Sequence, residues 1–230
     1  MMNSKIELIN WDSKFFNKEI GKINISNIEE FPNDQLKSFD LVYVFSQNDS
    51  LDFKLIDKKI VYLIENIEKT ENEMLDVQFY NSDIDKYEEL LLLTLQSGEY
   101  SRFKLDENFK NNEYEKLYRE WIDKSISKDL AFEIIVKKIE DKIVGFTTLA
   151  KKSDELADIS LVAVDSNYRG KGIALELIKK SIEVAKQKNF KKIQVVTQLD
   201  NEPANKLYLK AGFKEESITY IYHVWNYDTI

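Results

Sequence analysis

The chain of 230 residues contains no cysteine. This absence excludes disulfide bonds, thiolate metal sites and a cysteine nucleophile. Histidine is almost as scarce: His223 is the only one, so a site built from several histidines is impossible and a serine–histidine pair could form only there. We therefore expect no metal cofactor.

Arginine is also rare, since it occurs only at Arg102, Arg119 and Arg169, and the formal net charge is −8. Nucleic-acid-binding proteins usually carry a basic face, so this charge argues against a nucleic-acid partner. Apolar runs such as Leu90 to Leu93 are far too short to span a bilayer. The N-terminal stretch has no basic segment followed by an apolar one, so we expect a cytoplasmic protein with no membrane partner.

The hydrophobic periodicity predicts alternating short strands and helices. Strands are expected at 5–9, 19–25, 41–45 and 59–67, with a short helix at 50–56 and a longer one at 83–96. Further on, a helix at 112–126 precedes strands at 132–139, 143–149 and 157–164, then a helix at 172–188, a strand at 192–197, a helix at 203–211 and a strand at 218–225. This order predicts a mixed central sheet flanked by helices, in the α/β or α+β class, with a division between 1–97 and 98–230.

A glycine-rich turn follows the predicted strand that ends at Val164. A turn with little side chain lets backbone N–H groups reach an anion, and the N-terminus of the following helix adds positive partial charge. This combination suits a diphosphate, and it differs from both the ATPase phosphate loop and the dinucleotide fingerprint. An ordinary structural turn is the alternative. The residues concerned are Arg169, Gly170, Lys171, Gly172, Ile173 and Ala174.

A second constellation lies on the helix predicted at 203–211. Asn201, Asn205 and Tyr208 are spaced to share one face, between Pro203 near the helix start and Gly212 past its end. A packing tyrosine, a capping asparagine and a solvated asparagine are the alternatives.

Together, these two segments resemble the GNAT superfamily of acetyltransferases. The motifs are Arg-x-x-Gly-x-Ala at 169–174 and Asn-x-x-Ala-x-x-x-Tyr-x-x-x-Gly-Phe at 201–213. The resemblance implies the GNAT fold and acetyl-CoA as co-substrate, bound by 169–174, Asn201 and Asn205. It also implies backbone contacts to the coenzyme from Val162, Ala163 and Val164, with Tyr208 protonating the departing thiolate.

The remaining chain more loosely resembles the TDP-fucosamine acetyltransferases, through Asn-Trp-Asp-Ser-x-Phe-Phe at 10–16, Ser-Arg-Phe at 101–103 and a motif at 117–125. This resemblance implies an acceptor amine on a nucleotide-linked amino sugar. It also implies that 1–97 is a smaller α/β domain similar to a partial GNAT fold, on the acceptor side. Arg102 is the candidate for binding the acceptor's phosphates, although it could instead form an ion pair with Asp106 or Glu107.

We therefore expect an N-acetyltransferase that works by direct attack in a ternary complex. Glu65, at the end of an apolar strand, is a candidate base acting through water; a solvated strand-end glutamate is the alternative. Other primary amines, on polyamines, aminoglycosides, amino acids or protein N-termini, stay open as acceptors. So do a non-catalytic acyl-CoA sensor and a homodimeric state.

Overall fold

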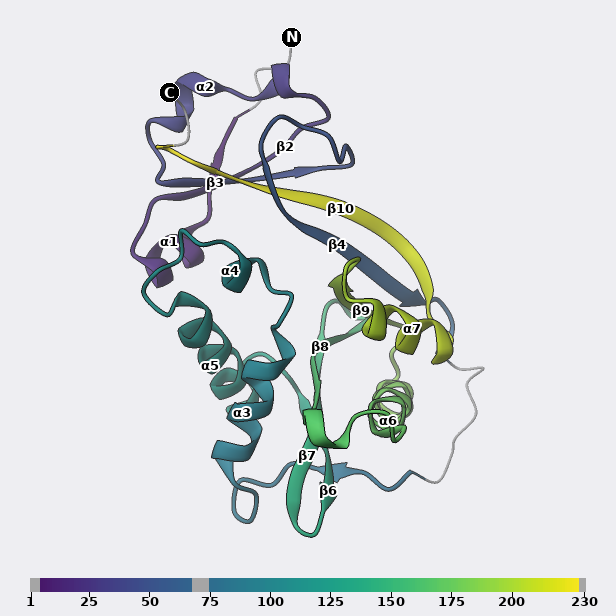
Figure 1. Ribbon diagram of the computed structural model, residues 1–230. Coiled ribbons are helices and arrows are strands. Elements are labelled where there is room, and N and C mark those ends of the chain that lie inside the picture. Colours follow the sequence, from purple (N-terminus) through teal and green to yellow (C-terminus); the bar gives the residue numbers. More distant parts are fainter. Residues whose placement is uncertain (1–4, 68–74, 228–230) are drawn as a thin grey trace. The chain divides into compact units, whose positions relative to one another are not determined.

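The computed structural model describes residues 5–67 and 75–227, which form two compact units (Figure 1). The first unit comprises Met1–Ile60, Gln198–Asp200 and Ser217–Ile230, and the second comprises Val61–Thr197 and Asn201–Glu216. The chain contacts thus divide after Ile60, and the C-terminal segment returns to the first unit. The assignment of 1–97 to the acceptor and 98–230 to the coenzyme stays a prediction.

The first unit is built on strands in the order β1-β2-β3-β10-β4. β2 is parallel to β3, whereas β1 with β2 and β3 with β10 are antiparallel pairs. The elements are β1 (Glu7–Leu8), α1 (Asn10–Phe16), β2 (Ile20–Asn24), a 3₁₀ turn (Ile28–Glu30), α2 (Asn33–Leu36), β3 (Leu41–Ser46), and parts of β4 (Lys54–Ile64) and β10 (Lys214–Trp225).

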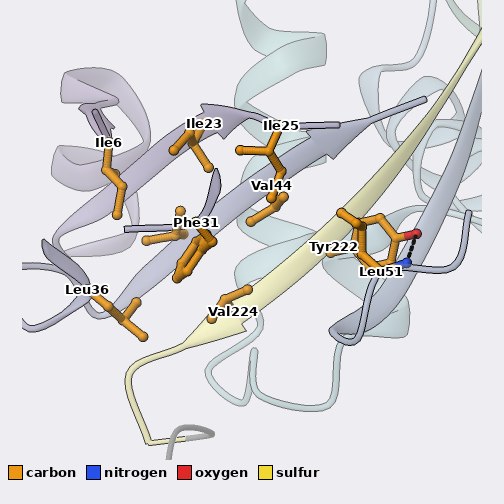
Figure 2. Close-up of a cluster of buried hydrophobic side chains, with 10 residues drawn as sticks. Ile6, Ile23, Ile25, Phe31, Leu36, Val44, Leu51, Tyr222 and Val224 are labelled. Atoms are coloured by element: carbon orange, nitrogen blue, oxygen red, sulfur yellow. Dashed lines mark hydrogen bonds between the residues drawn. The ribbon is translucent and has the colours of Figure 1, made fainter. Parts of the chain in front are cut away.

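Figure 2 shows the hydrophobic core of this unit. Side chains from β2, β3 and β10 meet those of Phe31 and Leu36 from the intervening segment. The Tyr222 hydroxyl holds the loop before β4 in place through two hydrogen bonds. It accepts one from the Leu51 N–H at 3.3 Å and donates one to the Asn48 carbonyl at 2.7 Å. His223, on the same strand, is buried beside Tyr43 with a ring separation of 4.9 Å.

The second unit contains strands in the order β9-β8-β7-β6-β5. Its elements are β5 (Gln78–Phe79), α3 (Tyr87–Ser97), α4 (Arg102–Leu105), α5 (Glu113–Ile126), β6 (Glu133–Ile139), β7 (Lys142–Lys151), β8 (Leu156–Val164), α6 (Ile173–Gln187), β9 (Lys192–Gln198) and α7 (Glu202–Lys210). β6 and β7 form a hairpin: Glu140 and Asp141 both have positive φ, at 49° and 62°, as its two-residue turn requires.

Helices cover both faces of this sheet (Figure 1). α3 and α6 both pack on β7 and β8. A Cβ on Gly145 of β7 would lie 3.1 Å from the Ile173 side chain of α6. The face of the sheet toward which this Cβ would point is therefore the one that α6 covers. α3 covers the other face, where its Glu89 accepts the Ile143 N–H at 2.9 Å. α5 packs against α3.

The helix expected at 50–56 is wrong, because Lys54–Ile56 begin β4 instead. Pairing within the sheet overrides local helix propensity there. The short elements α1, α2, α4 and β5 were not predicted. Throughout residues 5–67 and 75–227, every helix is too short or too polar to traverse a lipid bilayer.

Candidate active site

A β-bulge interrupts β8 in its middle. Val162 pairs with Thr147 of β7, but the next pair along is Ile159 with Leu149, so one residue of β7 faces two of β8. At the bulge, the Leu161 N–H donates a hydrogen bond of 3.0 Å to a threonine hydroxyl of β7 in place of a backbone carbonyl. Such a bulge bends the strand and changes which residues point to each neighbour.

The bulge separates the end of β8 from β9. The pairs that join these two parallel strands run from Leu156–Lys192 only as far as Ile159–Val195. Beyond the bulge, the Asp165 N–H donates toward β7, to the Val144 carbonyl at 2.9 Å. The N–H and carbonyl groups of successive strand residues point alternately to the two sides of the strand. The backbone N–H and carbonyl groups of Val162 and Val164 therefore point away from β7.

These two valines line what we call the open edge, Ser160–Val164 of β8 on the side away from β7. It presents the N–H and carbonyl of Val162 and the N–H of Val164. The Val164 carbonyl accepts a hydrogen bond of 3.1 Å from the Arg169 side chain, which anchors the following turn. The backbone of Ala163 points toward β7, so of the three predicted backbone contacts this geometry favours the two valines.

The turn after β8 matches the expected form. Asp165 caps a short 3₁₀ segment by accepting the Asn167 N–H at 3.0 Å, which lowers the pKa of its carboxyl. Gly170 and Gly172 have φ of +77° and +83°, in the left-handed region that favours glycine. A Cβ on either glycine would meet nothing within 4 Å, so open space adjoins this backbone.

α6 begins at Ile173 without a side-chain cap, because its N-cap residue is Gly172. The first N–H groups of a helix have no partner within the helix, and they carry its positive partial charge. Lys171 adds positive charge, and its Nζ lies over the Tyr168 ring at 4.9 Å from the centroid. The Nζ of Lys142 lies 5.8 Å from the same centroid, but it is ion-paired with Asp165 at 3.4 Å. The turn therefore fits a diphosphate, through unsatisfied donors, open space and positive charge.

Lys142 and Tyr168 were not among the predicted site residues. Tyr168 adjoins Arg169 in the motif, so its neighbours could have indicated it. Lys142 belongs to the β6–β7 hairpin, and nothing in its local sequence signals its place beside the turn.

One asparagine of the second motif, Asn201, has side-chain hydrogen-bond partners in the structure. The Asn201 side chain caps α7 by accepting the Ala204 N–H at 3.3 Å, and its amide donates to the Thr197 hydroxyl at 3.4 Å. The capping interpretation therefore describes Asn201. Asn205 lies half-buried one turn further on. Coenzyme binding by either residue stays a prediction.

Tyr208 is deeply buried, with 4% of its surface exposed. Its ring packs 5.7 Å from that of Tyr62 and 6.1 Å from that of Phe213. Burial, with a smaller contribution from Tyr62, raises the pKa of the Tyr208 phenol above its ordinary value. The phenol thus keeps its proton at neutral pH, as a general acid must, while it also serves as a packing residue.

Arg102 lies at the start of α4, which packs on α5 in the helical layer opposite α6. Its guanidinium carbon is 4.5 Å from the centroid of the Phe103 ring, and that ring is 6.5 Å from Trp121. The structure thus places Arg102 in an aromatic cluster, in a different layer from the helix that follows the glycine turn.

Glu65 is not brought to the open edge. It follows β4, and its carboxylate lies 2.6 Å from the ammonium of Lys192 at the start of β9. Lys192 pairs with Leu156, eight residues before Val164, so at about 3.3 Å per residue roughly 26 Å of strand intervenes. With 63% of its side chain exposed, Glu65 matches the alternative of a solvated strand-end glutamate, and its role as base stays a prediction.

The sequence profile described as the Acetyltransferase (GNAT) family matches residues 93–213, more than half of the chain. The protein belongs to the GNAT acetyltransferase family. The matched region begins in α3 and ends after α7, so it includes the open edge, the glycine turn and Tyr208.

Relatives agree with this membership. The chain is 28% identical to the spore coat polysaccharide biosynthesis protein SpsD of Bacillus subtilis over 125 residues, which cover 54% of this chain and 43% of SpsD. It is 29% identical to the uncharacterized N-acetyltransferase MJ1207 of Methanocaldococcus jannaschii over 118 residues, 48% of this chain and 50% of the relative. The matched regions thus span half or less of these relatives.

Solved structures confirm the GNAT fold. A functionally unknown conserved protein from Staphylococcus epidermidis superposes with a TM-score of 0.65, covering 98% of this chain and 92% of that one at 16% identity. A GCN5-related N-acetyltransferase from Sphaerobacter thermophilus gives 0.56, covering 86% and 63% at 13% identity.

Proposed function

We propose that this protein is an acetyl-CoA-dependent N-acetyltransferase that acts on a primary amine in the cytoplasm. One observation carries the proposal: the open edge of β8 leads directly into the uncapped N-terminus of α6. Backbone donors at Val162 and Val164 and the anion-binding turn at 169–174 thus follow one another along the chain.

These residues fit the two ends of the coenzyme. The N–H groups that open α6, together with Arg169 and Lys171, would hold the diphosphate. The exposed backbone of Val162 and Val164 would pair with the amides of the pantetheine arm, as an added strand would. The bound coenzyme supplies an acetyl group activated as a thioester.

The chain's own groups can assist the transfer. The acceptor ammonium must lose a proton before its amine can attack. A backbone N–H on the open edge would stabilise negative charge on the acetyl oxygen. Tyr208, kept protonated by burial, would donate its proton to the departing thiolate. Attack within a ternary complex requires no covalent enzyme intermediate.

For the acceptor we propose the amine of a nucleotide-linked amino-deoxy sugar. Support comes from the resemblance at 10–16, 101–103 and 117–125, and from a relative named for polysaccharide biosynthesis. Arg102 adds a physical reason: a guanidinium can bind phosphate through two hydrogen bonds, and the adjacent Phe103 and Trp121 suit the rings of a nucleotide sugar.

The test is a mass-spectrometric screen of purified protein with acetyl-CoA and a panel of amines. Acetylation of an amino-sugar nucleotide would support the proposal. Efficient acetylation of polyamines, aminoglycosides or peptides, with every amino-sugar nucleotide ignored, would refute the acceptor. Tight acetyl-CoA binding with no acceptor modified would instead favour an acyl-CoA sensor.

A further inference from the structure

A buried lysine of β6 lies beneath the first turn of α6. Lys137 is 8% exposed, and its Nζ is 2.9 Å from a carboxylate oxygen of Glu176 and 2.9 Å from one of Asp76. Burial opposes the charged ammonium, but the hydrogen bonds to the two carboxylates prevail and raise the pKa of Lys137. The side chain is therefore a fixed positive charge on the α6 face of the sheet.

Its partner Glu176 is an acidic residue at the anion-binding end of α6. The Glu176 N–H donates to the Gly172 carbonyl at 3.1 Å, which places the residue one helical turn from the N-cap. A carboxylate there favours the uncapped helix itself, because it faces the positive end of the helix dipole. The same charge repels any anion that binds at that end.

We propose that Lys137 is a positioning residue of the coenzyme site, which neutralises Glu176 and holds it against β6 so that α6 attracts the diphosphate. The inference rests on the proposed function, since it assumes that the diphosphate of acetyl-CoA binds at Gly172. Lys137 touches no part of that turn directly; it acts through Glu176.

The expected change in acetyl-CoA affinity follows from the distance between the charges and from their screening by salt. Four residues of helix rise about 6 Å, so the Glu176 carboxylate lies on the order of 8–10 Å from an anion at the turn. With an effective dielectric constant of about 20–40 and physiological salt, one uncompensated charge at that range changes affinity roughly three- to tenfold.

The neighbouring residue supplies a matched control. Lys138 forms an ion pair with Asp85, with 14% and 2% of the two side chains exposed. That pair lies on the opposite face of the sheet, because Asp85 directly precedes α3, the helix that covers that face. Lys138→Met therefore removes a lysine whose side chain is about as buried as that of Lys137, 14% against 10% exposed, without altering the charge beside α6.

The experiment measures acetyl-CoA affinity by calorimetry in the full chain, at physiological salt and in about 1 M salt. Lys137→Met should weaken binding roughly three- to tenfold, because Glu176 is then uncompensated. Glu176→Gln should instead tighten binding, and the double variant should return close to wild type. Lys138→Met should leave affinity unchanged. The differences should shrink in high salt, where charges are screened.

A merely structural ion pair would give another pattern, in which both single variants weaken binding equally or neither changes it. Either result would overturn the inference while leaving the proposed function intact. Should Lys137→Met not fold, Glu176→Gln decides alone, since unchanged or weaker binding overturns the inference. A wild-type protein that binds no acetyl-CoA would refute the proposed function as well.

Discussion

Replacing Gly172 by alanine or valine tests the turn on which the coenzyme assignment depends. At φ +83° and ψ −5° the residue is in the left-handed region, where an L side chain costs about 1–2 kcal/mol. The reduced freedom of the unfolded chain offsets about 0.4–1 kcal/mol of this cost for alanine. No atom lies within 4 Å of a built Cβ, so steric overlap inside the protein adds nothing. Alanine should therefore destabilise the fold by about 1 kcal/mol, and valine by more because of its branched Cβ.

The effect on the coenzyme should be larger than the effect on stability. A side chain at Gly172 would project into the open space beside the N–H groups that begin α6, and block the approach of a diphosphate. Loss of one charge-assisted hydrogen bond costs about 1.5–3 kcal/mol, which corresponds to a Kd for acetyl-CoA raised roughly tenfold to a hundredfold in Gly172→Val. Calorimetric titration measures that Kd, and thermal unfolding monitors stability.

Gly212 is the matched control, because its φ is +94° and its Cβ would also meet no atom within 4 Å. Gly212→Ala should cost similar stability at the end of α7 and leave the acetyl-CoA Kd unchanged. Unchanged affinity in a folded Gly172→Val protein would refute the reasoning, and the turn would then be purely structural.

Three further substitutions test the other site residues. Tyr208→Phe should lower turnover by roughly 10²- to 10⁴-fold with little change in the Kd for acetyl-CoA. Because burial raises the pKa of the Tyr208 phenol, the turnover of the wild-type protein should show no loss from ionisation of this phenol below about pH 10. Unchanged turnover, with chemistry rate-limiting, would remove Tyr208 from the mechanism. Arg102→Ala should raise the acceptor KM roughly tenfold to a hundredfold and spare acetyl-CoA binding; Arg119→Ala, on α5, is the control, and equal effects of both would contradict the assignment. Glu65→Gln should lower turnover most at low pH, where the acceptor amine is protonated; unchanged turnover in the folded variant would remove Glu65 as the base and leave only its ion pair with Lys192.

Long periodic segments were predictable from the sequence. The helix expected at 112–126 corresponds to α5 (Glu113–Ile126), and the strand expected at 192–197 to β9 (Lys192–Gln198). In such segments the apolar spacing and the local backbone preference agree. The helix expected at 50–56 failed because part of that stretch joins β4, where partners distant in the sequence decide the conformation.

The candidate active site likewise combines features set by the local sequence with features set by residues distant in the sequence. The sequence by itself determined the glycine turn, because positive φ at Gly170 and Gly172 and the start of α6 are local properties of adjacent residues. Only the tertiary structure decided that the bulge in β8 turns Val162 and Val164 toward the open edge, that Lys137 meets a carboxylate 39 residues away, and that Glu65 pairs with Lys192. Strand register and ion pairs between distant residues arise when separate segments pack together, and no short stretch of sequence contains both partners.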